Sequence, residues 1–119
     1  MKNKIALAIL GLALVSPLST LAAPKSEHYI FRYDSGYSFD VTLTDNTITW
    51  KVLEGSNKGQ TETDYIKRKM LTNQTEVIQW IEKNGTFVTV IFDRRHHEMI
   101  SSIKNESDMI MWPGTSESV

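Results

Sequence analysis

The sequence of 119 residues contains no cysteine. The protein therefore has no disulfide to stabilise its fold and no cysteine-linked lipid to anchor it to a membrane. Small exported domains often depend on disulfides, and this chain must depend on its hydrophobic core instead. Basic residues are not in excess either, because 13 Lys and Arg stand against 14 Asp and Glu. Since nucleic-acid-binding domains are usually basic, we expect no nucleic-acid partner.

A long apolar run is also lacking, and the longest one lies near the N-terminus. Residues 5–15 are apolar, follow Lys2 and Lys4, and precede a stretch rich in Ser, Thr and Ala. This run is too short to span a membrane comfortably, and its flanks are typical of a secretory signal peptide. We therefore predict that residues 1–22 are a cleaved signal peptide and that residues 23–119 are one periplasmic or secreted domain without a membrane anchor. An uncleaved anchor is the alternative.

Helical periodicity is absent after this segment, whereas residues 37–52 alternate between apolar and polar side chains. A period of two indicates strands with one buried face and one exposed face. A two-residue turn at residues 45–46 joins two such strands into a hairpin. The pairs on the buried face are then Leu43 with Ile48, Val41 with Trp50, and Phe39 with Val52.

A preceding strand is predicted at residues 28–33, with three aromatic side chains on one face. A loop at residues 34–36, in which Gly36 suits a positive φ, pairs Phe31 with Phe39. Tyr29, Phe31 and Tyr33 therefore join the same buried face.

The strongest hairpin signal is the Asn-Gly pair at residues 84–85, between apolar runs at residues 77–81 and 86–92. A two-residue turn there places Glu82 opposite Phe87. Both faces of this hairpin are apolar, so the periodicity leaves open which face points inward.

Three further strands are predicted at residues 61–68, 98–104 and 109–112, and Pro113 and Gly114 end the last of them before a polar tail. About eight short strands without helices indicate a sandwich or a small barrel, and a barrel of that size can hold one small ligand. We predict an all-β fold, a single small antiparallel up-and-down barrel.

Three motifs in this order resemble a known family. They are the aromatic strand and loop at residues 31–39, the strand and glycine loop at residues 47–59, and the Trp-Ile-Glu hairpin at residues 80–86. Together they resemble the MoaF-like family of lipocalin-like barrels and, more distantly, the bacterial phenolic acid decarboxylases. The resemblance covers residues 28–93.

The resemblance to the decarboxylases implies site residues, because those enzymes use two tyrosines, an arginine and a glutamate. The second tyrosine matches Tyr33 and the glutamate matches Glu82, but the first tyrosine position is Phe31 and the arginine position is Gln60. A neutral glutamine cannot form the charge-assisted fork that arginine forms with a carboxylate. The resemblance therefore implies an inherited barrel from which most of the decarboxylase chemistry is lost.

We predict a ligand pocket inside the barrel, with Tyr33 and Glu82 as its polar anchors and as the only candidate catalytic residues. Burial would raise the pKa of Glu82, whereas a solvated glutamate at the hairpin end would be inert. The aromatic rings would line this pocket, or alternatively fill the barrel completely. The predicted pocket residues are Tyr29, Phe31, Tyr33, Phe39, Trp50, Gln60, Trp80 and Glu82.

Metal and cofactor motifs are lacking. Asp93, His96, His97 and Glu98 are of metal-ligating type, but adjacent strand residues diverge and no spacing matches a zinc motif. No phosphate loop or nucleophile elbow is present, so we expect no metal and no cofactor.

Three functions follow from these features. The first is an exported barrel that binds a small apolar or aromatic molecule. The second is a lyase-like enzyme acting on a small aromatic acid with an incomplete catalytic set. The third is a periplasmic inhibitor or interaction module that works through its loops, although such barrels usually carry a disulfide.

Overall fold

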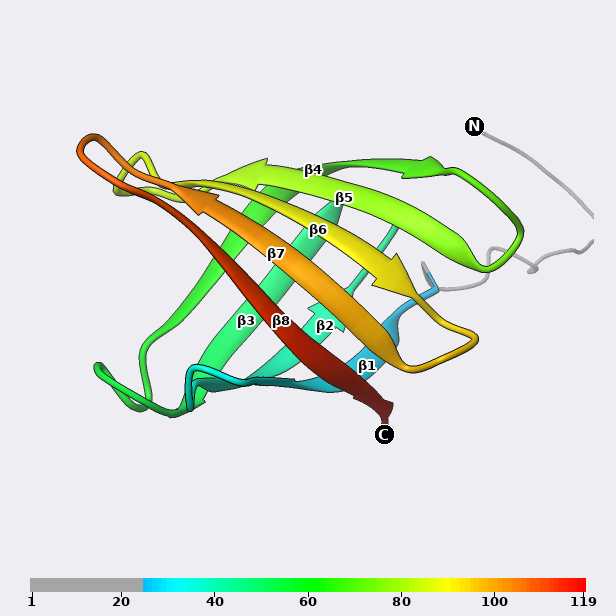
Figure 1. Cartoon of the computed structure of the whole chain (residues 1–119), viewed down its shortest axis with the longest axis horizontal. Helices are drawn as coiled ribbons and strands as arrows, with labels where there is room; N and C mark the ends of the chain where they lie inside the picture. The colour runs from blue at the N-terminus through cyan, green and yellow to red at the C-terminus, as the bar shows by residue number, and fades with distance from the viewer. Residues whose placement is uncertain (1–24) are drawn as a thin grey trace, which may run out of the picture.

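The computed structural model describes residues 25–119, which form one closed antiparallel β-barrel (Figure 1). Each strand pairs with the next along the chain and the last pairs with the first, so the predicted all-β up-and-down barrel is confirmed. The predicted signal peptide lies outside the described residues. In the described part of the chain, no helix is long and apolar enough to cross a membrane. The strands are β1 (Glu27–Tyr33), β2 (Ser38–Leu43), β3 (Thr47–Glu54), β4 (Thr61–Met70), β5 (Thr75–Ile81), β6 (Phe87–Asp93), β7 (Glu98–Lys104) and β8 (Met109–Ser118).

The first three strands have the register that the alternation predicts. Phe31 pairs with Phe39 across β1 and β2, and Val41 pairs with Trp50 across β2 and β3. These residues are buried or partly buried, because a single period-two face points inward along all three strands. Alternation and turn length together therefore fix this part of the barrel wall.

The register predicted for the β5–β6 hairpin is wrong by one residue. The loop holds three residues instead of two: Glu82 N–H donates to the Thr86 carbonyl, and Gly85, with φ of 91°, takes the left-handed position. Ile81 therefore pairs with Phe87, and both lie on the outside of the barrel. The inward apolar residues are Ile78 and Trp80 from β5 and Val88, Val90 and Phe92 from β6.

The predicted end of the last strand is also wrong. Strand β8 continues through Pro113 and Gly114 to Ser118, and its second half pairs with β1, where Gly114 lies opposite Tyr33. A Cβ atom on Gly114 would collide with the backbone carbonyl of Arg32. Glycine here permits the close approach of β8 to β1. Pro113 and Gly114 therefore lie in the seam where the barrel closes, and they do not end the strand.

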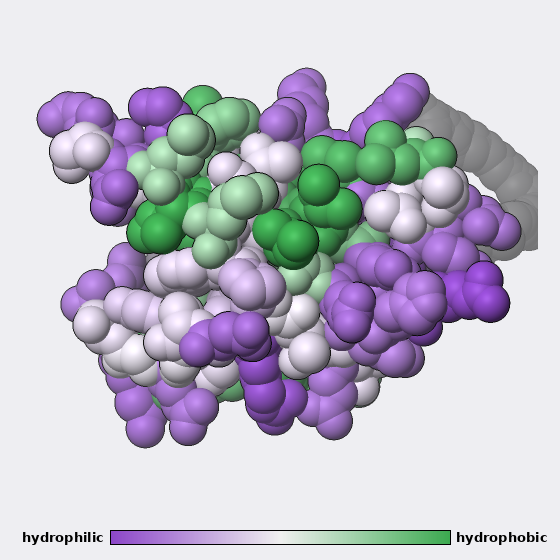
Figure 2. Space-filling model, viewed as in Figure 1, coloured by the Kyte–Doolittle hydropathy of each residue, from purple (hydrophilic) through white to green (hydrophobic). Residues whose placement is uncertain are grey.

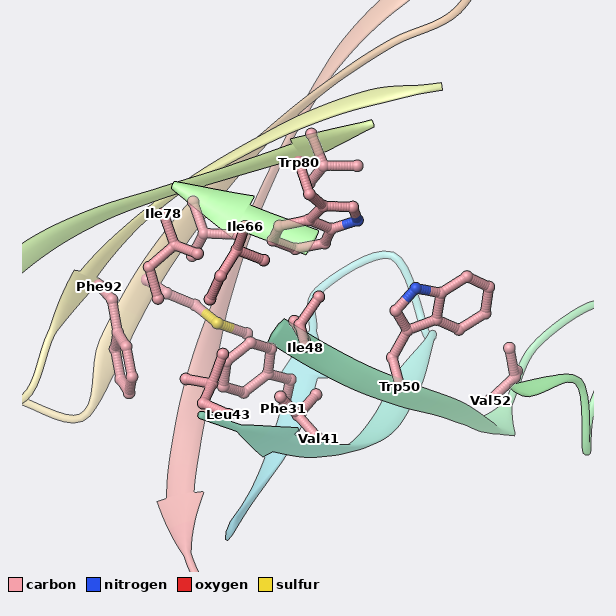
Figure 3. Close-up of a cluster of buried hydrophobic side chains, with 13 residues drawn as sticks. Phe31, Val41, Leu43, Ile48, Trp50, Val52, Ile66, Ile78, Trp80 and Phe92 are labelled. Atoms are coloured by element: carbon pink, nitrogen blue, oxygen red, sulfur yellow. The ribbon is translucent and has the colours of Figure 1, made fainter. Parts of the chain in front are cut away.

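One end of the barrel is closed by packed side chains and ion pairs. Phe92 is fully buried and packs edge-on against Tyr29, with the ring centroids 5.0 Å apart. Beyond these rings lies a cluster of two carboxylates and two guanidinium groups, called here the ion-pair cluster: Glu27, Arg68, Glu76 and Arg94. Trp50 and Val52 lie at the far end of the hydrophobic cluster from Phe92 (Figure 3).

The outer face of the barrel carries exposed apolar side chains among polar ones (Figure 2). Several of these side chains come from the outward positions of β5 to β8, where Ile91 pairs with Ile100. Ile81, Phe87, Ile91, Ile100, Met109 and Met111 are the main ones.

Candidate functional site

A cavity of about 230 Å³ lies inside the barrel at the end opposite the ion-pair cluster. The β1–β2, β3–β4 and β5–β6 loops surround this end, and Asn57, Gln60 and Asn84 from these loops contribute to the lining. Deeper in the barrel the cavity ends on Phe31, Val41 and Ile48. The cavity therefore has a polar rim and an apolar floor, as ligand pockets in small barrels have.

Seven of the lining side chains are aromatic: Phe31, Tyr33, Tyr37, Phe39, Trp50, Trp80 and Trp112. At the rim, the rings of Tyr37 and Trp112 are stacked with centroids 5.0 Å apart. The ring of Trp112 also packs at 5.4 Å against Tyr33, and Phe39 meets Trp50 edge-on. These contacts hold the aromatic faces in fixed orientations around the cavity.

Tyr33 presents its ring to the cavity and directs its hydroxyl into the protein. Its Oη lies 2.7 Å from Oγ of Ser101, which is buried on β7. Burial is the main cause that raises the pKa of Tyr33 to about 12, and the nearby charge of Glu82 raises it further, while the Ser101 hydrogen bond opposes both. The phenol is therefore neutral at physiological pH and already has a hydrogen-bond partner.

Strand β4 changes neighbours midway, which gathers carboxylates at one side of the cavity. Its first half pairs with β3 up to Tyr65, and its second half pairs with β5 from Ile66 onward. Glu62 and Asp64 lie on the first half, where β5 has separated from β4. The Lys83 backbone N–H donates to Glu62 Oε2 at 2.9 Å and bridges part of the gap.

Each of two tryptophans that line the cavity donates a hydrogen bond to a carboxylate in this region. Nε1 of Trp50 lies 3.1 Å from Oδ2 of Asp64, and Nε1 of Trp80 lies 3.3 Å from Oε2 of Glu82. Asp64 is almost fully buried behind Trp50, and Glu82 is partly buried and faces the cavity. The indoles thus satisfy polar groups whose burial would otherwise be costly.

Both carboxyls have raised pKa values. Burial raises the pKa of Glu82 to about 7, the Trp80 hydrogen bond partly opposes this, and the charges of Glu62 and Asp64 raise it further. Burial raises the pKa of Asp64 to about 6, with a further contribution from Glu62, and Trp50 and Lys83 oppose the rise. Near neutral pH, Glu82 can therefore either donate or accept a proton.

The structure brings together most of the predicted pocket residues. Tyr29 is the exception, because its hydroxyl donates to Glu27 Oε1 at 2.6 Å at the closed end and its side chain is not part of the cavity lining. Glu82 lies beside Trp80 and not opposite Phe87, where the predicted register puts it, because Phe87 pairs with Ile81 and points outward. The residues that share the cavity are Phe31, Tyr33, Phe39, Trp50, Gln60, Trp80 and Glu82, and a ligand-binding role for them stays a prediction.

Sequence reasoning missed Trp112 and Asp64. Trp112 and Gly114 are two residues apart and lie on the same, inward face of β8. Extension of the predicted strand beyond Pro113 would therefore have placed Trp112 inside the barrel. Asp64 carries no such signal, because an acidic side chain at an inward position breaks the apolar alternation by which strands are recognised.

The His96 and His97 segment forms a turn, in which His96 Nδ1 contacts Asp93 Oδ2 at 2.8 Å. Within residues 25–119, no group of three or more His, Asp or Glu side chains is arranged to hold a metal ion.

Comparison with known proteins places the chain in a family. No curated protein matches its sequence. A solved structure from Burkholderia vietnamiensis, described as a "putative beta-lactamase", superposes with a TM-score of 0.73 at 19% identity, covering 78% of this chain and 92% of that one. At this identity the likeness shows a shared fold alone, and the more distant resemblance to phenolic acid decarboxylases is not shown. The MoaF-like family model matches residues 25–117, and the chain therefore belongs to the MoaF-like family.

Proposed function

We propose that this protein binds a small aromatic molecule in the cavity at the open end of the barrel. The observation that carries the proposal is a preformed cavity surrounded by seven aromatic side chains in a barrel whose other end is closed. A volume of about 230 Å³ suits a single substituted ring, since an apolar cavity of about 150 Å³ in another protein binds benzene.

A lyase acting on an aromatic acid receives less support from the same lining. Tyr33 and Glu82 both face the cavity, and the raised pKa of Glu82 suits acid–base chemistry. However, of the described residues that line the cavity, none is Lys, Arg or His, so no cation is in place to hold a substrate carboxylate. We therefore propose binding and not decarboxylation.

Calorimetric titration with benzyl alcohol tests the proposal. We expect saturable binding with one site per chain, and we expect Trp112→Ala to weaken it by about tenfold, because stacked aromatic contacts contribute about 0.5–1.5 kcal/mol beyond their buried area. Met111→Ala is the matched control, since Met111 neighbours Trp112 on β8 but lies on the exterior. An absence of binding, or equal effects of the two substitutions, would contradict the proposal.

Export is a separate proposal that rests on the basic, apolar and small-residue pattern of residues 1–22. Expression of the full chain in a bacterium, followed by intact-mass measurement of the periplasmic fraction, tests it. A mass that corresponds to residues 23–119 is expected, and a full-length protein held in the membrane fraction would contradict it.

A further inference from the structure

Acidic side chains outnumber basic ones near the cavity. Glu82 is the one ionisable acid or base, apart from tyrosine, among the described lining residues. The carboxylates of Glu62 and Asp64 are not part of the lining, and their charges raise the pKa of Glu82. The positive charge of Lys83 acts on Asp64, but its ammonium group donates to the Thr63 carbonyl and lines a hollow on the outer wall instead of the cavity.

Glu82 also has free hydrogen-bonding capacity. Its Oε2 accepts the Trp80 indole N–H, whereas no hydrogen bond within residues 25–119 reaches Oε1. A partly buried carboxylate oxygen without a donor is a ready acceptor for an ammonium group.

The aromatic lining has the same electrostatic preference as the carboxylates. The face of an aromatic ring carries negative quadrupolar charge, and tryptophan attracts cations most strongly. Trp50, Trp80 and Trp112 contribute three indoles to the wall, and Tyr33 and Tyr37 add two phenols. An anionic ligand would meet Glu82 and these ring faces without a compensating cation.

Building on the proposed aromatic-binding function, we propose that the cavity selects small organic cations, such as an amine joined to an aromatic ring, over neutral or anionic compounds of the same shape. The ammonium group donates to Glu82 and contacts the indole faces, and the aromatic ring of the ligand occupies the space above Phe31 and Ile48. The neutral amides and hydroxyls of the rim leave this preference unopposed: Ser56, Asn57, Gln60 and Asn84.

A cation bound beside Glu82 stabilises its ionised form, so binding near neutral pH expels a proton from this carboxyl. The titratable groups that act on Glu82 or are acted on by it are Tyr33 on β1 and Glu62 and Asp64 on β4, and the ammonium group of the adjacent Lys83 lies on the outer wall. Tyr33 remains neutral throughout the range, because its pKa is raised to about 12. Amine affinity is therefore expected to rise about tenfold between pH 6 and pH 8, as Glu82 ionises with a pKa of about 7.

The test compares benzylamine, benzyl alcohol and benzoate as ligands of the full domain by calorimetry at pH 8. We expect benzylamine to bind at least about tenfold more tightly than benzyl alcohol, and benzoate to bind most weakly, because a hydrogen bond between charged groups contributes more than a neutral one. Glu82→Gln should remove the preference for benzylamine over benzyl alcohol and the pH dependence of benzylamine binding. Glu106→Gln removes an exposed charge from the β7–β8 loop at the same end of the barrel, and it should change neither.

The outcomes separate this inference from the function on which it rests. If benzyl alcohol or benzoate binds as tightly as benzylamine, the cation preference is overturned and aromatic binding stands. If Glu82→Gln keeps the full preference for benzylamine, the role of Glu82 is overturned. If none of the three compounds binds, both proposals fail together.

Discussion

The indole of Trp80 and the carboxyl of Glu82, two residues apart at the end of β5, form one hydrogen-bonded pair at the wall of the cavity. The tryptophan supplies an apolar ring and a single N–H donor. The glutamate accepts a hydrogen bond from that N–H, which does not cancel the charge of its ionised form. Because one pair contributes both the hydrophobic surface and the titratable group, the ionisation of Glu82 is coupled to the stability of the fold and, in the proposed function, to the binding of the ligand.

The first prediction concerns Glu82→Gln and the pH dependence of stability. Burial raises the pKa of Glu82 to about 7 from an ordinary 4.5, so the native state favours the protonated carboxyl. This contribution to stability is fully present below pH 4.5 and is lost as the pH rises through 7. Between pH 5 and pH 8 we expect the free energy of unfolding to fall by about 2 kcal/mol more in the wild type than in Glu82→Gln. The difference is no larger because Glu82 is partly exposed and solvent screens its charge.

Urea unfolding at several pH values measures this difference directly. Asp64, whose pKa is raised to about 6, contributes with the same sign in both proteins, so the difference between the two curves reports Glu82 together with its interaction with Asp64. Parallel stability curves for the two proteins would show that Glu82 is as well solvated in the folded state as in the unfolded state.

The second prediction concerns the ion-pair cluster. Arg68 donates to both carboxylate oxygens of Glu76, at 2.6 and 2.9 Å, and Glu76 is only 3% exposed. Arg68→Met leaves this buried carboxylate with Arg94 alone, and we expect a loss of about 3 kcal/mol in the free energy of unfolding. Arg32→Met is the matched control, because its exposed pair with Glu117 should contribute less than about 1 kcal/mol.

The same cluster predicts acid sensitivity. Burial alone would raise the pKa of Glu76, but hydrogen bonds from Arg68 and Arg94 outweigh it and lower the pKa. Hydrogen bonds from Tyr29, Arg94 and Arg68 likewise outweigh burial at Glu27 and lower its pKa to about 2. This stability is present above pH 4.5 and is lost as the pH falls toward 2, so Arg68→Met should flatten the acid limb of the curve. An acid limb identical to that of Arg32→Met would contradict the assignment.

The sequence predicts the β1–β3 wall well because two constraints agree there. The alternation assigns the buried face, and each turn length selects the same pairing, such as Phe31 with Phe39. In the β5–β6 hairpin the alternation supplies no constraint. Both faces are apolar, so the choice between a two-residue and a three-residue loop at Gly85 decides only which β6 residues share a face with Trp80, and three-dimensional packing decides which face is buried.

The candidate site divides in the same way. Aromatic residues on well-patterned strands, such as Tyr33 and Trp50, can be assigned to the interior from sequence. The carboxylates of Glu62 and Asp64 cannot, because they reach the site only where β4 leaves β5 for β3. The electrostatic character of the cavity thus depends on a change of strand partner that has no local sequence signal.

The third prediction concerns the seam between β1 and β8. Gly114 lies so close to β1 that an added Cβ would collide with the Arg32 carbonyl, a backbone atom that cannot move aside cheaply, and would press on the Tyr33 ring at 3.0 Å. We expect Gly114→Ala to cost about 1–3 kcal/mol in the free energy of unfolding, as overpacking typically does. Thr115→Ala, at the adjacent exposed position of β8, should cost much less.

Hydrogen exchange distinguishes a weakened seam from a general loss of stability. If Gly114→Ala opens the barrel at β1 and β8, amides that bridge these strands should lose protection before those between β5 and β6. The Asp34 N–H, which donates to the Pro113 carbonyl at 3.0 Å, is the most direct reporter. Because Tyr33 lines the cavity and packs against Trp112, the same substitution should also weaken benzyl alcohol binding. Uniform protection losses across all strands, with binding intact, would show that the seam does not position these rings.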